Sequence, residues 1–318
     1  MQVTVVGAGV IGLTTAVTLE EHGHRVRVVA AAKRADTTSA IAGAVWFPYR
    51  VGPPHKVCGW AQRTRCWLQQ LARTTPEAGV DVLTAYEILG DDGTSRPWWA
   101  AAPTMEGDAL ATEALDVEWV PAPVDGGPHG WKFTAPRAQP SLFLPYLESR
   151  LQQPIDQRVV VDLVREPGDV VVNCTGLGAR ELVGDALLQP LLGQVVIAER
   201  GKADPAITVT DDRDPERIFY IIPRRDEVVL GGCSLPFPPG DEPRVDADIT
   251  ARILAHAQRL GISVGAVRTE RVGLRPYRAE VRLERDAHHR RIVHNYGHGG
   301  AGFTLCRGCA EDVAALLA

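Results

Sequence analysis

The sequence predicts an α/β protein in which a discontinuous Rossmann-like dinucleotide-binding domain is joined to a second domain with a mostly antiparallel sheet. Three observations support this prediction. A strand, a glycine-rich loop, a helix and a second strand follow one another in residues 3–29. A further buried strand runs into a glycine-rich turn at residues 173–179. After residue 192, short strand patterns recur between turn residues, which is typical of an antiparallel sheet.

Composition limits the class of protein. The chain has 318 residues, which is long enough for two domains. Its net charge of −5 argues against a nucleic-acid partner, which would need a basic surface. The sequence contains no apolar run of about 18 residues, so no membrane partner is expected. Because the chain begins directly with a strand pattern rather than a signal peptide, the expected location is the cytoplasm.

The six cysteines are scattered, which favours reduced thiols over a disulfide framework. Cys306 and Cys309 form a CxxC pair, but no second pair stands at the spacing of a zinc site. Both open an apolar C-terminal segment with a helical pattern. We therefore predict that they pack in the core and that the protein has no metal site.

The N-terminal unit has the spacing of a dinucleotide pyrophosphate site. Residues 3–6 form a strand pattern, and a helical pattern follows the loop and ends at Gly23. In the loop, Gly7 permits a tight turn, Gly9 lets the backbone approach a phosphate, and Gly12 lets the helix pack closely on the strand. The helix N-terminus offers free N–H groups and the positive end of its dipole to the pyrophosphate.

One part of the dinucleotide fingerprint is missing. An acidic residue is expected after the second strand, at residues 25–29, to bind the adenosine ribose. The sequence instead has Ala30, Ala31 and Ala32, followed by Lys33 and Arg34. A 2′-phosphate on the cofactor is then conceivable, and the glycine pattern alone leaves both FAD and NADP open.

The remaining elements follow from hydrophobic periodicity. Helices are predicted over residues 140–151 and 246–260 and from residue 306 to the C-terminus. Strands are predicted over residues 158–162, 169–172, 194–198, 217–222, 228–231, 271–275 and 281–284.

Five blocks of sequence, in order, carry a resemblance to a known family. They are residues 7–12 (GAGVIG), 42–49 (AGAVWFPY), 173–176 (NCTG), 275–284 (RPYRAEVRLE) and 292–304 (IVHNYGHGGAGFT). Together they resemble the D-amino-acid oxidases, flavoenzymes with the glutathione-reductase-like FAD fold. The resemblance implies FAD rather than NADP as cofactor. It also implies an FAD-binding domain formed by residues 1–75, 137–190 and 279–318, and a substrate and interface domain formed by residues 76–136 and 191–278.

The resemblance implies cofactor contacts from four parts of the chain. Hydroxyl residues at positions 37–39 match the surroundings of the pyrophosphate, and small residues at 42–44 match the stretch along the flavin. Residues 299–304 match a glycine-rich turn at a helix N-terminus, where backbone N–H groups can stabilise negative charge on the flavin. The implied cofactor contacts are Gly7, Ala8, Gly9, Val10, Ile11, Gly12, Thr37, Thr38, Ser39, Ala42, Gly43, Ala44, Val159, Thr175, Gly299, Gly300, Ala301, Gly302, Phe303 and Thr304.

The resemblance also implies three substrate contacts. Arg278 matches the arginine that holds the substrate carboxylate, a group that a planar guanidinium binds with two parallel hydrogen bonds. Tyr220 matches a tyrosine on the same carboxylate, and Gly300 matches a glycine whose carbonyl accepts from the amine. The neighbouring arginines, Arg275 and Arg285, are expected to matter less.

The implied reaction is oxidation of a D-amino acid by FAD to an imino acid, with O2 reoxidising the flavin to give hydrogen peroxide. It requires no side-chain acid or base, because the cofactor carries the redox step. Neutral substrates are expected, since a second carboxylate would need a further cation; Arg213, Arg217 and Arg224 are the candidates. The alternatives are a D-aspartate oxidase, a glycine or sarcosine oxidase, and a non-catalytic FAD- or NADP-binding protein. A homodimer is expected by analogy alone.

Overall fold

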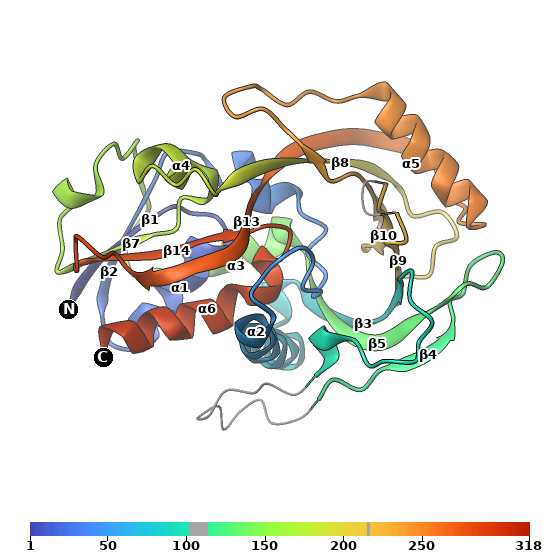
Figure 1. The fold of residues 1–318 in the computed structure, drawn as a ribbon, viewed down its shortest axis with the longest axis horizontal. Coiled ribbons are helices and arrows are strands. Elements are labelled where there is room, and N and C mark those ends of the chain that lie inside the picture. The colour runs from blue at the N-terminus through green and yellow to red at the C-terminus, as the bar shows by residue number, and fades with distance from the viewer. Residues whose placement is uncertain (102–113, 215–216) are drawn as a thin grey trace.

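The computed structural model describes residues 1–101, 114–214 and 217–318. The remaining two segments belong to the predicted substrate domain and lie outside the described residues. Within the described part, one large mixed sheet runs through the molecule in the order β4-β5-β3-β9-β10-β11-β8-β13-β14-β7-β1-β2-β6, with β12 paired to β8 (Figure 1). The strands are β1 Gln2–Val6, β2 Arg25–Ala30, β3 Val80–Ile88, β4 Glu118–Pro121, β5 His129–Ala138, β6 Asp156–Gln157, β7 Val170–Asn173, β8 Gln189–Glu199, β9 Ile207–Asp211, β10 Phe219–Pro223, β11 Glu227–Gly231, β12 Leu235–Pro236, β13 Val267–Arg285 and β14 Ile292–His298.

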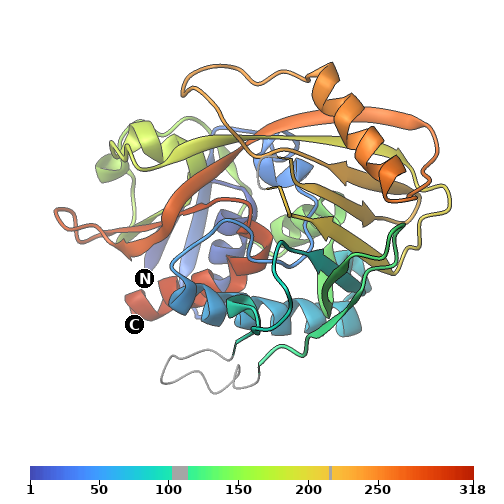
Figure 2. The ribbon, with the colours of Figure 1, turned by 45° about the vertical axis from the view of Figure 1, so that its right-hand side comes forward.

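One end of the sheet is parallel. Strand β1 pairs with β2 on one side and with β7 on the other, and β7 pairs with β14, all in parallel. Both chain termini lie at this end of the molecule in both views (Figures 1 and 2). Since parallel strands point the same way, the loops that follow them meet at one edge, where the N-terminal glycine loop also lies.

The other part of the sheet is mostly antiparallel and is joined to the first by the long strand β13. The first half of β13 pairs with β8, and its second half pairs with β14. Tyr277 is the register partner of both Gln189 in β8 and His298 in β14. The two predicted domains are therefore built on one continuous sheet, and their boundaries stay a prediction.

Helices cover the faces of the sheet. They are α1 Val10–Glu21, α2 Pro54–Thr74, α3 Pro140–Ser149, α4 Ala179–Leu182, α5 Ala247–Arg259 and α6 Gly302–Leu317. Helix α1 packs between the parallel strands and α6, and α5 lies across the outer face of the antiparallel strands (Figure 2). None of the helices in the described ranges is long and apolar enough to cross a membrane.

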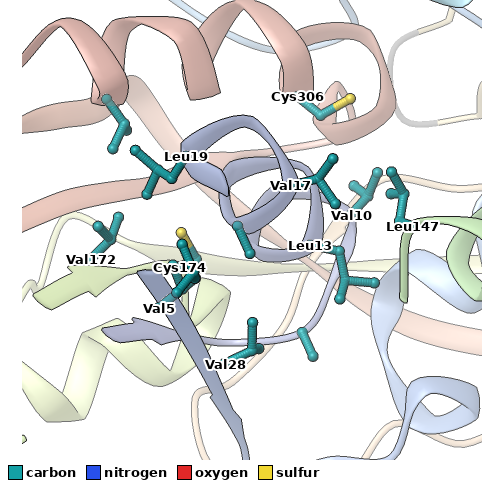
Figure 3. Packing of buried hydrophobic residues seen from close by; sticks show 14 of the residues in the cluster. Val5, Val10, Leu13, Val17, Leu19, Val28, Leu147, Val172, Cys174 and Cys306 are labelled. Carbon is teal, nitrogen blue, oxygen red and sulfur yellow. The ribbon is translucent and has the colours of Figure 1, made fainter. Parts of the chain in front are cut away.

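The core of the parallel part forms between β1, β2 and β7 and the helices above them (Figure 3). Leu13 of α1 is fully buried between Val5, Val28 and Leu147 of that cluster. Cys306 is buried in the same cluster and Cys309 in the neighbouring one, so both cysteines pack in the core as predicted.

Most predicted elements are confirmed, and local sequence explains their ends. Helix α1 ends at Glu21, and Gly23, two residues later, adopts a left-handed φ of 80° that turns the chain away from the helix. Helix α5 begins after Asp246, whose side chain accepts from the Asp248 N–H at 2.8 Å.

The strand predicted over residues 158–162 is wrong. Only the two preceding residues, in β6, pair with β2, because β2 ends at Ala30 and offers no partner to the residues that follow. The two strands predicted within residues 271–284 are one strand, β13.

Leu13→Ala tests the packing between α1 and the parallel strands. Removing a fully buried leucine side chain leaves a cavity, and we expect the free energy of unfolding to fall by about 2–5 kcal/mol. Urea denaturation of the FAD-depleted protein measures it. Leu187→Ala, at a leucine that is 66% exposed, is the control. Equal losses in the two variants would contradict this account of the core.

Candidate functional site

A cavity of about 770 Å³ lies where the parallel strands end and the inner face of the antiparallel strands begins. The segments that follow β1, β2, β7 and β14 all contribute to its wall. This is the edge of a parallel sheet at which ligands bind. Of the predicted cofactor contacts, the wall contains Gly7, Ala8, Gly9, Val10, Ile11, Thr37, Thr38, Ser39, Ala42, Gly43, Ala44, Val159, Thr175, Gly299, Gly300, Gly302 and Phe303.

The glycine loop after β1 has the geometry that its three glycines predict. Gly7 has a φ of 114°, and a Cβ there would lie 2.3 Å from the Cys174 carbonyl oxygen. A Cβ at Gly12 would lie 1.9 Å from the Gly7 carbonyl oxygen, so this glycine serves helix packing and is not in the cavity wall. At Gly9 the only atom that a Cβ would approach is Ser39 Oγ, at 3.2 Å. The backbone at Gly9 is thus open to the cavity.

Ser39 ties a second segment to this loop. Its hydroxyl oxygen accepts a hydrogen bond from the Val10 N–H, the first residue of α1, at 3.0 Å. The neighbouring Thr38 donates to the Leu274 carbonyl at 3.1 Å. The hydroxyl residues at 37–39 are therefore held against the N-terminus of α1, where a pyrophosphate is expected.

The part of the cavity wall that follows β2 contains an acidic residue at a different position from the predicted one. Ala30, Ala31 and Ala32 line the wall, and a carboxylate is supplied by Asp36, further along the chain. Lys33 does not line the cavity, and Arg34 is paired with Glu148. The two basic residues that left NADP open are thus outside the cavity wall. The sequence pattern missed Asp36 because the fingerprint expects the acid directly after the strand.

At the opposite end, helix α6 directs its N-terminus at the cavity. Gly302 and Phe303, the first residues of α6, line the wall, and no side chain caps the helix. Its free N–H groups and dipole favour negative charge at this end. His298 also lines the cavity. Burial lowers its pKa to about 3, and its Nε2 has no hydrogen-bond partner among the residues that the structure describes. An open glycine loop at one end and a helix N-terminus with an unpartnered ring nitrogen at the other fit FAD.

Two predicted flavin contacts are not in the cavity wall. Ala301 is fully buried in a core cluster. Thr304 is also buried, and its hydroxyl donates to the Phe47 carbonyl at 2.8 Å and accepts from the Phe47 N–H at 3.1 Å. Thr304 therefore holds the segment at residues 42–47 in place. The predicted flavin contacts of Ala301 and Thr304 stay predictions, since burial of a side chain leaves the contacts of its backbone open.

The antiparallel strands provide the second wall. Alternation places Arg271, Gly273 and Arg275 of β13 on the cavity side. The guanidinium of Arg275 lies over Gly193 of β8, where a Cβ would be 2.5 Å from Nη1. That Nη1 donates to the Cys233 carbonyl at 2.8 Å and to the Leu192 carbonyl at 3.3 Å. The glycine in β8 thus provides the space for a cation in the cavity wall.

Two tyrosines lie close to this arginine. The ring of Tyr220 in β10 lies over Gly231 of β11, with Cζ 2.0 Å from the position of a Cβ there. Burial raises the pKa of Tyr220, and the nearby charge of Arg275 opposes that rise. Tyr49 packs on Gly300. Tyr220 and Gly300, both predicted, therefore meet around Arg275.

Arg278 lies elsewhere. It does not line the cavity, and its Nε donates to Asp185 Oδ2 at 3.1 Å while its Nη1 donates to the Glu280 carbonyl at 2.7 Å. Burial alone would raise the pKa of Asp185, but the Tyr296 hydroxyl and Arg278 more than offset it, so that pKa is lowered. This position disagrees with the predicted substrate contact. Residues three apart in a strand face opposite sides, so Arg275 and Arg278 could not both face the cavity.

The three arginines considered for an acidic substrate are also outside the cavity wall. Arg213 pairs with Asp211, Arg217 with Asp214, and Arg224 with Glu227. The wall also contains Arg275, which was expected to matter less, and residues that the sequence did not single out. Among the latter are Tyr49, Glu87, Thr208, Thr210, Ile218, Ile222 and Arg271.

Comparison with known proteins identifies relatives across nearly the whole chain. Residues 2–316 match a family described as FAD dependent oxidoreductase. A D-amino-acid oxidase of Streptomyces coelicolor is 38% identical over 99% of this chain and 96% of its own length. A D-amino-acid oxidase of Rubrobacter xylanophilus is 39% identical over 98% and 94% of the two chains. A D-aspartate oxidase of Homo sapiens is 33% identical over 99% and 94%.

A solved structure confirms the fold. Glycine oxidase from Bacillus cereus superimposes with a TM-score of 0.78 over 99% of this chain and 96% of that chain, at 17% identity. The predicted fold class, with its Rossmann-like part and mostly antiparallel part, is therefore confirmed.

Gly9→Val tests the cofactor end of the cavity. The wild-type protein should purify yellow with bound FAD. Because Gly9 has ordinary backbone angles and an open surface, the variant should fold but lose at least about tenfold in FAD affinity, since its side chain would occupy the phosphate approach. Flavin absorbance after gel filtration measures retention, and circular dichroism of the FAD-free protein checks folding. A folded Gly9→Val protein with normal FAD content would contradict the assignment.

Proposed function

Because the chain belongs to the family of FAD-dependent oxidoreductases, we propose that it oxidises D-amino acids. The products would be an imino acid, which water hydrolyses to a 2-oxo acid and ammonia, and hydrogen peroxide from O2. When bound, FAD supplies the redox chemistry by accepting a hydride from Cα. The observation that carries the proposal is the cation of Arg275 in the wall of a cavity that fits the cofactor, with Tyr220 and Gly300 beside it.

Arg275 replaces Arg278 as the proposed carboxylate contact. Two carbonyl oxygens orient one nitrogen of its guanidinium, while the side chain stays in the cavity wall. A planar guanidinium fixed in this way can meet a carboxylate with parallel hydrogen bonds. Arg278, in contrast, already neutralises the buried Asp185.

Tyr220 and Gly300 complete the proposed substrate site. The Tyr220 hydroxyl lies near the Arg275 guanidinium and can add a bond to the same carboxylate. Gly300 stands next to the Arg275 side chain, and its carbonyl is proposed to accept from the substrate amine. Holding the carboxylate and the amine while Cα–H faces the flavin leaves one handedness, which accounts for selection of the D-isomer.

Neutral substrates are proposed to be preferred over acidic ones. Arg213, Arg217 and Arg224 are each paired with a carboxylate and are outside the cavity wall. A second carboxylate buried without a cation would cost several kcal/mol. Arg271 is in the wall, but it is exposed at the solvent side. This reading favours a D-amino-acid oxidase over a D-aspartate oxidase.

O2 as acceptor, a cytoplasmic location and a homodimer are further parts of the proposal. The six cysteines, all free thiols, support a reducing compartment. The dimer rests on family analogy alone, and sedimentation of the purified protein would test it.

A substrate panel tests the reaction. Neutral D-amino acids such as D-alanine should give peroxide with a kcat/KM at least about tenfold above that of D-aspartate, because the second carboxylate lacks a partner. L-isomers should give none. Peroxide is measured by a coupled peroxidase assay on the yellow protein. A yellow protein inactive on every D-amino acid would overturn the proposal, and D-aspartate as best substrate would overturn the neutral preference.

Arg275→Ala and Arg278→Ala separate the two arginines. Loss of two charge-assisted hydrogen bonds should lower kcat/KM of Arg275→Ala for neutral D-amino acids by about 10²- to 10⁴-fold, with unchanged FAD content. Arg278→Ala should keep kcat/KM within about threefold, a limit of about 0.7 kcal/mol. It should lose about 1–3 kcal/mol of stability, because the buried Asp185 loses a partner. Steady-state kinetics and urea denaturation measure both. The reverse pattern would restore Arg278 as the carboxylate contact.

A further inference from the structure

Glu87 stands in the same cross-strand row as the proposed substrate residues. In register, Glu87 of β3 is opposite Thr210 of β9, Thr210 is opposite Tyr220 of β10, and Tyr220 is opposite Gly231 of β11. Register partners in a sheet point to the same face. Glu87, Thr210 and Tyr220 accordingly all line the cavity.

The side chains of this row leave an open stretch between Glu87 and Arg275. The ring of Tyr220 leans over Gly231, away from β9. Thr210, which has a short side chain and is partly exposed, then forms the floor between Tyr220 and Glu87. The row from Glu87 in β3 to Tyr220 in β10 covers two strand spacings, about 10 Å in the direction of the hydrogen bonds, and Arg275 lies beyond Tyr220 in the strand order. That span suits a substrate with an elongated side chain.

One carboxyl oxygen of Glu87 lacks a hydrogen-bond partner among the described residues. Its residue is 2% exposed, and Oε2 is buried without a hydrogen-bond partner. Burial raises the pKa of Glu87 well above its usual value, a hydrogen bond with Thr210 opposes this, and the nearby Asp212 adds to it. No ion pair between Glu87 and a cation is found in the parts of the chain that the structure describes. A buried carboxyl oxygen without a hydrogen-bond donor lowers the stability of the fold, unless a bound ligand supplies the donor.

We propose that Glu87 binds the end of the substrate side chain and selects D-amino acids whose side chain ends in a nitrogen donor, such as an ammonium group. The inference rests on the proposed function, which places the carboxylate at Arg275. The cavity then has a cation at one end of the sheet face and an acid at the other. A long cationic substrate is complementary to both, whereas a second carboxylate would meet Glu87 and be repelled.

The test compares pairs of ligands that differ only at the tip. D-lysine and D-norleucine differ by a terminal ammonium in place of a methyl group, and kcat/KM is measured for both with wild type, Glu87→Leu and Glu87→Gln. The wild type should favour D-lysine. In Glu87→Leu the ratio of D-lysine to D-norleucine should fall by at least about tenfold, with a smaller fall in Glu87→Gln, which keeps a carbonyl acceptor.

A control substitution and a binding measurement separate the possible failures. Glu118→Gln, at an exposed acid of β4 outside the cavity, should leave the ratio unchanged. Binding of 6-aminohexanoate relative to hexanoate, followed by the visible absorbance of the flavin, reports the same preference without turnover. It should also fall in Glu87→Leu.

The outcomes are distinguishable. An unchanged ratio in Glu87→Leu, or an equal loss for D-lysine and D-norleucine, would overturn the role of Glu87; equal loss would indicate a part in a step common to all substrates. If no D-amino acid is oxidised, the proposed function fails, and the ratio of the two hexanoate affinities still decides whether Glu87 binds a nitrogen donor.

Discussion

The continuous strand β13 is the constraint on which the arrangement of the site depends. Its first half is hydrogen-bonded to the antiparallel strand β8 and its second half to the parallel-sheet strand β14, with Tyr277 registered to both. The wall that carries Arg275 and the turn that begins α6 are thus parts of one hydrogen-bonded network. A substrate held at Arg275 would therefore be positioned relative to the cofactor by backbone bonds rather than by a hinge between domains.

Glycines let the backbone segments pack closely and leave room for the cavity. Gly7 and Gly12 let β1, α1 and the end of β7 approach more closely than any side chain permits. In the antiparallel wall, Gly193 and Gly231 have no side chains. The Arg275 guanidinium occupies the space above Gly193, and the Tyr220 ring occupies the space above Gly231. Large polar groups can lie flat on the sheet only because these positions are empty, which leaves the cavity above them open.

Charge is distributed across this cavity with few compensating pairs. Arg275 donates to two neutral carbonyl groups, and Glu87 has a carboxyl oxygen without a hydrogen-bond partner among the described residues. Elsewhere the arginines and acids neutralise one another, as at Arg278 and Asp185 or Arg213 and Asp211.

The sequence by itself determined the Rossmann-like unit and the cofactor end of the cavity, because these depend on local features. The turn at Gly7, the close packing at Gly12 and the start of α1 all follow from neighbouring residues. The position of Asp36 in the cavity wall and the burial of Ala301 and Thr304 do not follow from neighbouring residues. They depend on how a loop or a helix is oriented relative to the rest of the cavity wall. Strand alternation indicates that Arg275 and Arg278 face opposite sides, but only pairing with β8 decides which side is the cavity. Glu87 lines the cavity for the same reason: its place is set by register with Thr210 of β9, a residue more than a hundred positions away in the chain.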